Sequence, residues 1–128
     1  MLTEKEFLCD DNAYLNEKTN KKENVYKSSI FWSLPDILII DLKRYDNFLK
    51  KINTNIDIPL NNLNLTKFVC GYENNKYIYD LFAVCNHHGS CHGGHYTVNI
   101  KNANNKWYSI NDTIINEIKE DKVVSQSA

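Results

Sequence analysis

The stretch "AVCNHHGSCHGGHYTVNI", from Ala83 to Ile100, places a run rich in histidine and glycine between two alternating apolar segments. All four histidines of the 128-residue chain, and three of its four glycines, lie within positions 87–95. Residues 76–88 and 95–101 alternate with the period of two that is typical of β-strands. The stretch therefore predicts two long strands joined by a histidine–glycine loop. A loop held by rigid strands is a common place for chemistry.

Further strands are predicted on either side of this stretch. The turn "NANN" at 102–105 leads into "KWYSIND" at 106–112, a hairpin partner for the second strand. The short β-branched run 37–42 predicts a strand buried on both faces, and 52–60 predicts an edge strand closed by a proline. The tail 116–128 fits either a short strand with a helical turn or a frayed end. The chain is thus predicted to be mainly antiparallel β with little helix.

Bulk composition excludes several classes of function. The chain is 42% hydrophobic and 24% charged with a net charge of −1, which gives no long-range attraction to nucleic acid or to a membrane surface. No apolar run approaches the roughly 18 residues of a membrane span, and no signal-peptide pattern opens the chain. We therefore expect cytoplasmic or nuclear localisation with reduced cysteines. The polar first thirty residues indicate a solvated arm or connecting segment.

The histidine–glycine run is open to three interpretations. It contains six potential ligands for zinc, but their spacing is irregular and the glycine pair prevents a helix from aligning them. A loop histidine is also often a plain surface residue, which is our interpretation of His88, whereas His92 fits a surface or a functional role equally. The third interpretation is catalysis, and it depends on His95. The zinc ligands in question are Cys85, His87, His88, Cys91, His92 and His95.

Catalysis would use the neighbours of His95 as well as its ring. Gly93 and Gly94 permit close backbone approach, so a substrate's main chain could lie against them. An imidazole titrates near 6.5 when unperturbed, so it can take a proton from a thiol at cellular pH. Asn111 and Asp112, at the hairpin return, are candidates to orient the ring. A cysteine–histidine pair with such an orienting residue is the papain-type arrangement.

Several ordered motifs across residues 32–124 resemble the ubiquitin-specific proteases, a family of cysteine-protease deubiquitinases. "GGHYTV" at 93–98 followed by "WYSIND" at 107–112 resembles the histidine box of that family. The chain also carries counterparts of its leucine–proline strand, its short strand before an L-x-L segment, and its Tyr-x-Leu-x-Ala-Val strand. These are "LPDILIIDLKRY", "IDIPL" with "LNL", and "YDLFAVCNHHG".

The resemblance implies an α+β, mainly antiparallel β fold, the C-terminal palm and fingers part of a papain-like catalytic domain. It implies that His95 is the catalytic histidine, that Asn111 holds the third catalytic position and that Asp112 assists. The loop 87–94 is similar to the loop that borders the channel for ubiquitin's C-terminal tail. Substrate-binding residues implied by this similarity are His87, His92, Gly93, Gly94 and Tyr96. Core packing is the expected role of Trp107 and Tyr108.

The sequence departs from the family pattern in three places. Nothing resembles the cysteine box, so we expect residues 31–128 to supply the base and its orienter to an N-terminal half of the domain that carries the nucleophile. Residues 1–30 resemble a remnant of the fingers, where Cys9 lacks its second cysteine, and we expect no zinc and no cofactor there. The family's last strand also has no counterpart, which leaves an unpaired sheet edge.

The expected function is hydrolysis of the bond after the C-terminal glycine of ubiquitin, with ubiquitin or ubiquitinated proteins as partners and neither nucleic acid nor membrane involved. Two alternatives remain open from the sequence. One is a catalytically inactive scaffold of the same fold that binds ubiquitin. The other is a zinc-binding domain built on the histidine cluster.

Overall fold

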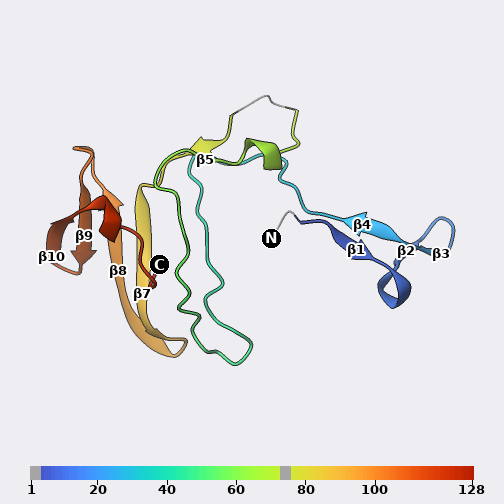
Figure 1. The fold of residues 1–128 in the computed structure, drawn as a ribbon, viewed down its shortest axis with the longest axis horizontal. Helices are drawn as coiled ribbons and strands as arrows, with labels where there is room; N and C mark the ends of the chain where they lie inside the picture. The colour runs from blue at the N-terminus through green and yellow to red at the C-terminus, as the bar shows by residue number, and fades with distance from the viewer. Residues whose placement is uncertain (1–3, 73–75) are drawn as a thin grey trace. The chain divides into compact units, whose positions relative to one another are not determined.

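A computed structural model describes residues 4–72 and 76–128, which divide into two compact units (Figure 1). The first unit takes its residues from 1–36 and 64–77, and the second from 37–63 and 78–128. Strands dominate the described residues, whose helical turns are all of the short 3₁₀ type. No helix in this part of the chain is long and apolar enough to cross a membrane. The prediction of a mainly antiparallel β fold is confirmed.

A four-stranded antiparallel sheet forms the centre of the second unit. Its strands are β7 (Ala83–Ser90), β8 (Gly93–Lys101), β9 (Trp107–Asn111) and β10 (Ile114–Ile118), in the spatial order β10-β9-β8-β7 (Figure 1). Each strand therefore pairs with its neighbour in sequence through a hairpin. The strands predicted at 95–101 and 106–112 are confirmed, whereas the strand predicted at 76–88 is divided into β6 (Ile78–Tyr79), which pairs outside this sheet, and β7. The ambiguous tail supplies part of β10 followed by a 3₁₀ turn at Glu120–Lys122.

The histidine–glycine run differs from the predicted loop, because β7 and β8 continue through it. Ser90 pairs with Gly93, so the connection is the two-residue turn Cys91–His92. Gly89 lies opposite Gly94, and two residues without Cβ let the strands approach closely enough to keep pairing. The predicted loop is therefore the tip of a rigid hairpin.

The core of the second unit lies on one face of this sheet. Val84, Trp107 and Val123 are its buried side chains, and Val123 reaches the sheet because the tail folds back over it. Asn99 donates a hydrogen bond from Nδ2 to the Val123 carbonyl at 2.8 Å, which ties the tail down. The expectation that Trp107 packs in the core is confirmed, since only 2% of it is exposed.

Two strand predictions in this unit are wrong. Residues 37–42 and 52–60 form no strand, although 37–42 is extended and apolar. Ile39 is 87% exposed, because no strand among the described residues pairs with this run and no layer covers it. The segment is anchored after the run by Arg44, which is buried and donates to the carbonyls of Ile52, Thr54 and Ala128.

The first unit consists of short ladders. β1 (Glu6–Leu8) pairs with β4 (Val25–Lys27), and β2 (Tyr14–Asn16) pairs with β3 (Lys21–Glu23). The polar composition of this segment did not predict them, but its side chains are mostly exposed, as expected of a solvated segment. At the positions where the chain passes from one unit to the other, β5 (Leu63–Asn64) pairs with β6 (Ile78–Tyr79). The remaining elements are 3₁₀ turns at Asp10–Asn12 and Thr66–Phe68.

Candidate active site

His95 and Asn111 are brought together by the register of β8 and β9. Val98 pairs with Ile110, so continuing the ladder by one step brings Asn111 level with Thr97. Side chains two positions apart on a strand share a face, which places His95 and Asn111 as diagonal neighbours on the same face. Their side chains meet there, with 2.6 Å between His95 Nε2 and Asn111 Oδ1.

This contact selects the tautomer of the imidazole. An amide oxygen only accepts hydrogen bonds, so the His95 Nε2 that faces it must carry the hydrogen. In the neutral ring the other nitrogen, Nδ1, is then without a proton and can accept one. The His95 side chain is 51% exposed, so its ring can be reached from outside the unit. The contact therefore gives the ring a fixed orientation and leaves Nδ1 available to accept a proton.

Asp112 lies farther from the ring than Asn111 does. Its Oδ2 is 3.9 Å from His95 Nε2, and its side chain is 79% exposed. Asp112 begins the two-residue turn between β9 and β10 with a φ of 49°, a conformation that aspartate tolerates better than most residues. Sequence spacing made Asn111 and Asp112 equal candidates, and the geometry gives the direct hydrogen bond to Asn111.

The glycines of the hairpin tip differ in what surrounds them. A Cβ on Gly94 would lie 2.4 Å from both His87 Nε2 and the His88 carbonyl, so this glycine is required by its own hairpin. Gly93 has a φ of 154°, and a Cβ there would meet nothing within 4 Å. Open space beside the backbone, which the predicted substrate role needs, is therefore found at Gly93.

A cluster of side chains that the sequence did not predict surrounds His87. The His87 ring stacks on Tyr96, its cross-strand partner, with ring centroids 4.6 Å apart. The Tyr45 hydroxyl lies 3.2 Å from His87 Nδ1, and Lys51 Nζ donates to the His87 carbonyl. Desolvation raises the pKa of the Tyr45 phenol above its ordinary value, and the nearby acidic groups of Cys91 and Tyr96 raise it further. Tyr96 itself is 64% exposed and accessible to a ligand.

The sequence gives only a weak indication that Tyr45 and Lys51 contact His87. Tyr45 ends the quoted run "LKRY", and a backbone bridge pairs it with Lys51 across a short turn. Each lies 36 or more positions before His87, so local periodicity carries no information about their contact.

The other two histidines lie at the exposed end of the hairpin. His88 Nδ1 is 3.2 Å from the Ser127 hydroxyl, and the backbone N–H of His92 donates to Ser90 Oγ. Within residues 4–72 and 76–128, no group of three or more histidine, cysteine, aspartate or glutamate side chains could hold a metal ion. All four cysteines are free thiols.

Comparisons with a family model and with known proteins agree on one family. The family model described as ubiquitin carboxyl-terminal hydrolase matches residues 5–128. Ubiquitin carboxyl-terminal hydrolase 4 of Pongo abelii is 36% identical over 132 residues, an alignment that covers 100% of this chain and 14% of that protein. Hydrolase 8 of Arabidopsis thaliana is also 36% identical, over 99% of this chain and 15% of its own length. The chain thus spans about one seventh of these curated relatives.

Solved structures agree with the sequence relatives. A SAGA deubiquitinase module containing Ubp8, Sgf11, Sus1 and Sgf73 superposes with a TM-score of 0.78 at 28% identity. The superposition covers 99% of this chain and 29% of the matched chain. A Ubp8 module bound to monoubiquitin superposes with a TM-score of 0.77 at 25% identity, over 99% of this chain and 29% of that chain.

Proposed function

The chain belongs to the ubiquitin carboxyl-terminal hydrolase family, and from this premise we propose that it supplies the general base of a deubiquitinase catalytic domain. The observation that carries the proposal is the 2.6 Å contact between His95 Nε2 and Asn111 Oδ1. We infer that the nucleophilic cysteine comes from another part of a longer parent protein, because none of the chain's four cysteines lies in a motif that resembles the family's cysteine box. The partner is ubiquitin, which a Ubp8 module of the same fold binds.

The chemistry follows the roles that the geometry allows. His95 Nδ1 takes the proton of the cysteine thiol, and the thiolate attacks the carbonyl carbon of ubiquitin's terminal glycine. His95 then gives the proton to the departing amine, which leaves a thioester. In the second half of the reaction His95 takes a proton from water, and the resulting hydroxide attacks the thioester carbon. The C–S bond then breaks, His95 returns the proton to the thiolate, and the released glycine carboxyl group loses its proton to solvent. The ring thus alternates between accepting and donating at Nδ1.

Asn111 keeps the ring in position during these transfers. Its neutral amide orients the imidazole through Nε2, but it stabilises the imidazolium less than a carboxylate would. Asp112, at 3.9 Å, adds a weaker electrostatic contribution that solvent screens. Asn111 is therefore the orienting residue and Asp112 an assisting one.

The hairpin tip of β7 and β8 forms one side of the channel for ubiquitin's tail. Tyr96 presents an exposed ring, and Gly93 leaves open space beside the backbone. This open side lets the extended main chain of ubiquitin's C-terminal tail approach the hairpin backbone, and its two glycines present no side chain that would obstruct the approach. His87 fixes the tip by its contacts to Tyr45 and Lys51, and His92 lies at the exposed turn.

The test uses the longer parent protein and ubiquitin carrying a fluorogenic group on its C-terminal carboxylate. The parent should release the fluorophore, and His95→Ala should reduce kcat/KM by about 10²-fold or more. The matched control is His88→Ala, because His88 is the cross-strand partner of His95 and should retain activity within about twofold. A parent that binds ubiquitin without cleaving it, or an active His95→Ala variant, would overturn the proposal.

A further inference from the structure

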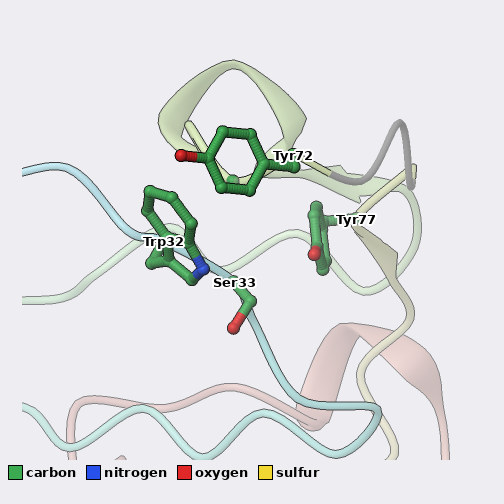
Figure 2. A pocket seen from close by; sticks show the side chains of 5 residues that line it. Trp32, Ser33, Tyr72 and Tyr77 are labelled. Atoms are coloured by element: carbon green, nitrogen blue, oxygen red, sulfur yellow. The ribbon is translucent and has the colours of Figure 1, made fainter.

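A second site lies in the first unit, apart from the residues that the proposed chemistry uses. A cavity of about 310 Å³ is lined by Trp32, Ser33, Gly71, Tyr72 and Tyr77. The three aromatic rings stand around its opening, with Ser33 at its base (Figure 2). Trp32 and Tyr72 meet edge to face, with ring centroids 4.9 Å apart and an interplanar angle of 89°. The volume is at the small end of ligand pockets and suits one or two side chains.

Backbone contacts hold two walls of this cavity together. The Phe31 N–H donates to the Phe68 carbonyl, and the Cys70 N–H donates to the Phe31 carbonyl, both at 2.9 Å. A Cβ on Gly71 would lie 2.2 Å from the Trp32 carbonyl oxygen, so only glycine permits this approach. The segments that carry Trp32 and Tyr72 are therefore fixed side by side.

The third wall is fixed in the same way. The Tyr77 N–H donates to the Thr66 hydroxyl at 3.0 Å, and the Leu65 N–H donates to the Tyr77 carbonyl at 2.8 Å. Hydrogen bonds thus hold the backbone at Phe31 and Cys70, beside Trp32 and near Tyr72, and at Tyr77 itself. A preformed site loses little conformational entropy when it binds.

The rings themselves are available to a ligand. Tyr72 is 93% exposed and Trp32 is 57% exposed, and Tyr77 is half-buried. Clustered exposed aromatic side chains are unusual on a protein surface and are the residue types that contribute most to binding when they become buried. The cluster therefore has the composition of a recognition site.

The polar groups of the lining indicate which ligand fits. Trp32 Nε1, the Ser33 hydroxyl and the two tyrosine hydroxyls can all donate hydrogen bonds, and no carboxylate or cation belongs to the lining. A bound cation would lose hydration without meeting a carboxylate, and only the faces of the aromatic rings would attract it. A polyproline II segment is the opposite case, because its carbonyls have no internal partner and proline has no N–H to satisfy. Donors around apolar rings complement such a ligand.

We propose that this cavity binds a proline-rich segment of a partner protein in the polyproline II conformation. The proline ring packs between Trp32 and the two tyrosines, and the donors of the lining take the carbonyls that precede and follow it. The chain has only Pro35 and Pro59 and no proline-rich run, so the segment comes from outside these 128 residues. The site is independent of His95 and does not require hydrolase activity.

Tryptophan fluorescence of the 128-residue chain can test this proposal. The chain has two tryptophans, and Trp107 is only 2% exposed and lies in the other unit, so a ligand-induced change reports on Trp32. A ten-residue peptide with two P-x-x-P repeats should give a saturable change, and the same peptide with alanine in place of proline should not. Tyr72→Ala should weaken binding about tenfold, because it removes one ring of the cluster.

Two further measurements keep the result interpretable. Tyr72→Ala is expected to fold, since the side chain is almost fully exposed, and Tyr14→Ala, 52% exposed in the same unit, should leave binding unchanged. Equal binding of the alanine peptide, no saturable binding of the proline peptide, or preferential binding of a trimethyl-lysine peptide would each overturn the proposal.

Discussion

Replacing Asn111 by alanine removes the oxygen that lies 2.6 Å from His95 Nε2 and leaves the strand that carries it unchanged. The His95 side chain is half exposed, so the hydrogen bond contributes at most about 0.5–1.5 kcal/mol to stability, and the variant should fold. The effect on catalysis should be larger, because the ring loses both its orientation and its fixed tautomer.

The expected magnitude follows from the rotamers that become available. Three χ1 wells and a roughly two-fold χ2 give a released imidazole about six orientations, of which one presents Nδ1 correctly. The fraction of rings in the productive orientation therefore falls about sixfold, and the loss of the preferred tautomer lowers the rate further. General-base catalysis as a whole contributes about 10²- to 10⁴-fold. We therefore expect kcat/KM to fall by about 10- to 100-fold.

The assay is hydrolysis of a fluorogenic ubiquitin substrate by the parent protein across a pH series. Asn111→Asp restores a hydrogen-bond acceptor for Nε2, so it should recover most of the activity. Asp112→Ala should cost less than Asn111→Ala. An Asn111→Ala variant with unchanged kcat/KM, together with a large loss in Asp112→Ala, would refute the assignment of the orienting residue.

Three further predictions concern stability. Gly94→Ala places a Cβ 2.4 Å from the neighbouring strand's backbone and should lower the free energy of unfolding by about 1–3 kcal/mol in urea denaturation, whereas Cys91→Ala at the exposed turn should not. Tyr45 has a raised pKa in the folded chain, so its contribution to stability is full below pH 10 and is lost as the pH rises through the folded pKa. Tyr45→Phe should therefore reduce the loss of unfolding free energy at alkaline pH, as measured by unfolding across a pH series. Trp107→Ala should cost about 3–5 kcal/mol by calorimetry, and a smaller effect than Trp32→Ala would contradict the placement of the core.

Alternation predicted the central sheet because each strand pairs with its neighbour in sequence. The spacing of sixteen positions between His95 and Asn111 then followed from a hairpin return, and the register of β8 and β9 accounts for their contact. The Ile37–Leu42 run shows the limit of this reasoning. Its apolar, β-branched pattern specifies a preference for burial, but it does not supply the strand that would bury it.

Contacts between distant segments could not be predicted in this way. Tyr45, Lys51 and His87 meet across 36 or more positions, and nothing in their local patterns marks the pairing. The loop predicted for the histidine–glycine run was wrong for a different reason. Its glycines favour a loop by intrinsic preference, but opposite each other in a ladder they allow the two strands to continue to the turn.

The central claim is that Asn111 holds His95 with Nε2 protonated and Nδ1 free to act as a base. Imidazole ¹⁵N chemical shifts of the 128-residue chain, measured by NMR over a pH series that includes the neutral form of the ring, test this claim without requiring a nucleophile. A single Nε2–H tautomer is expected for His95, and averaging between tautomers is expected in Asn111→Ala. A His95 ring that carries its proton on Nδ1, or one that Asn111→Ala leaves unchanged, would contradict it.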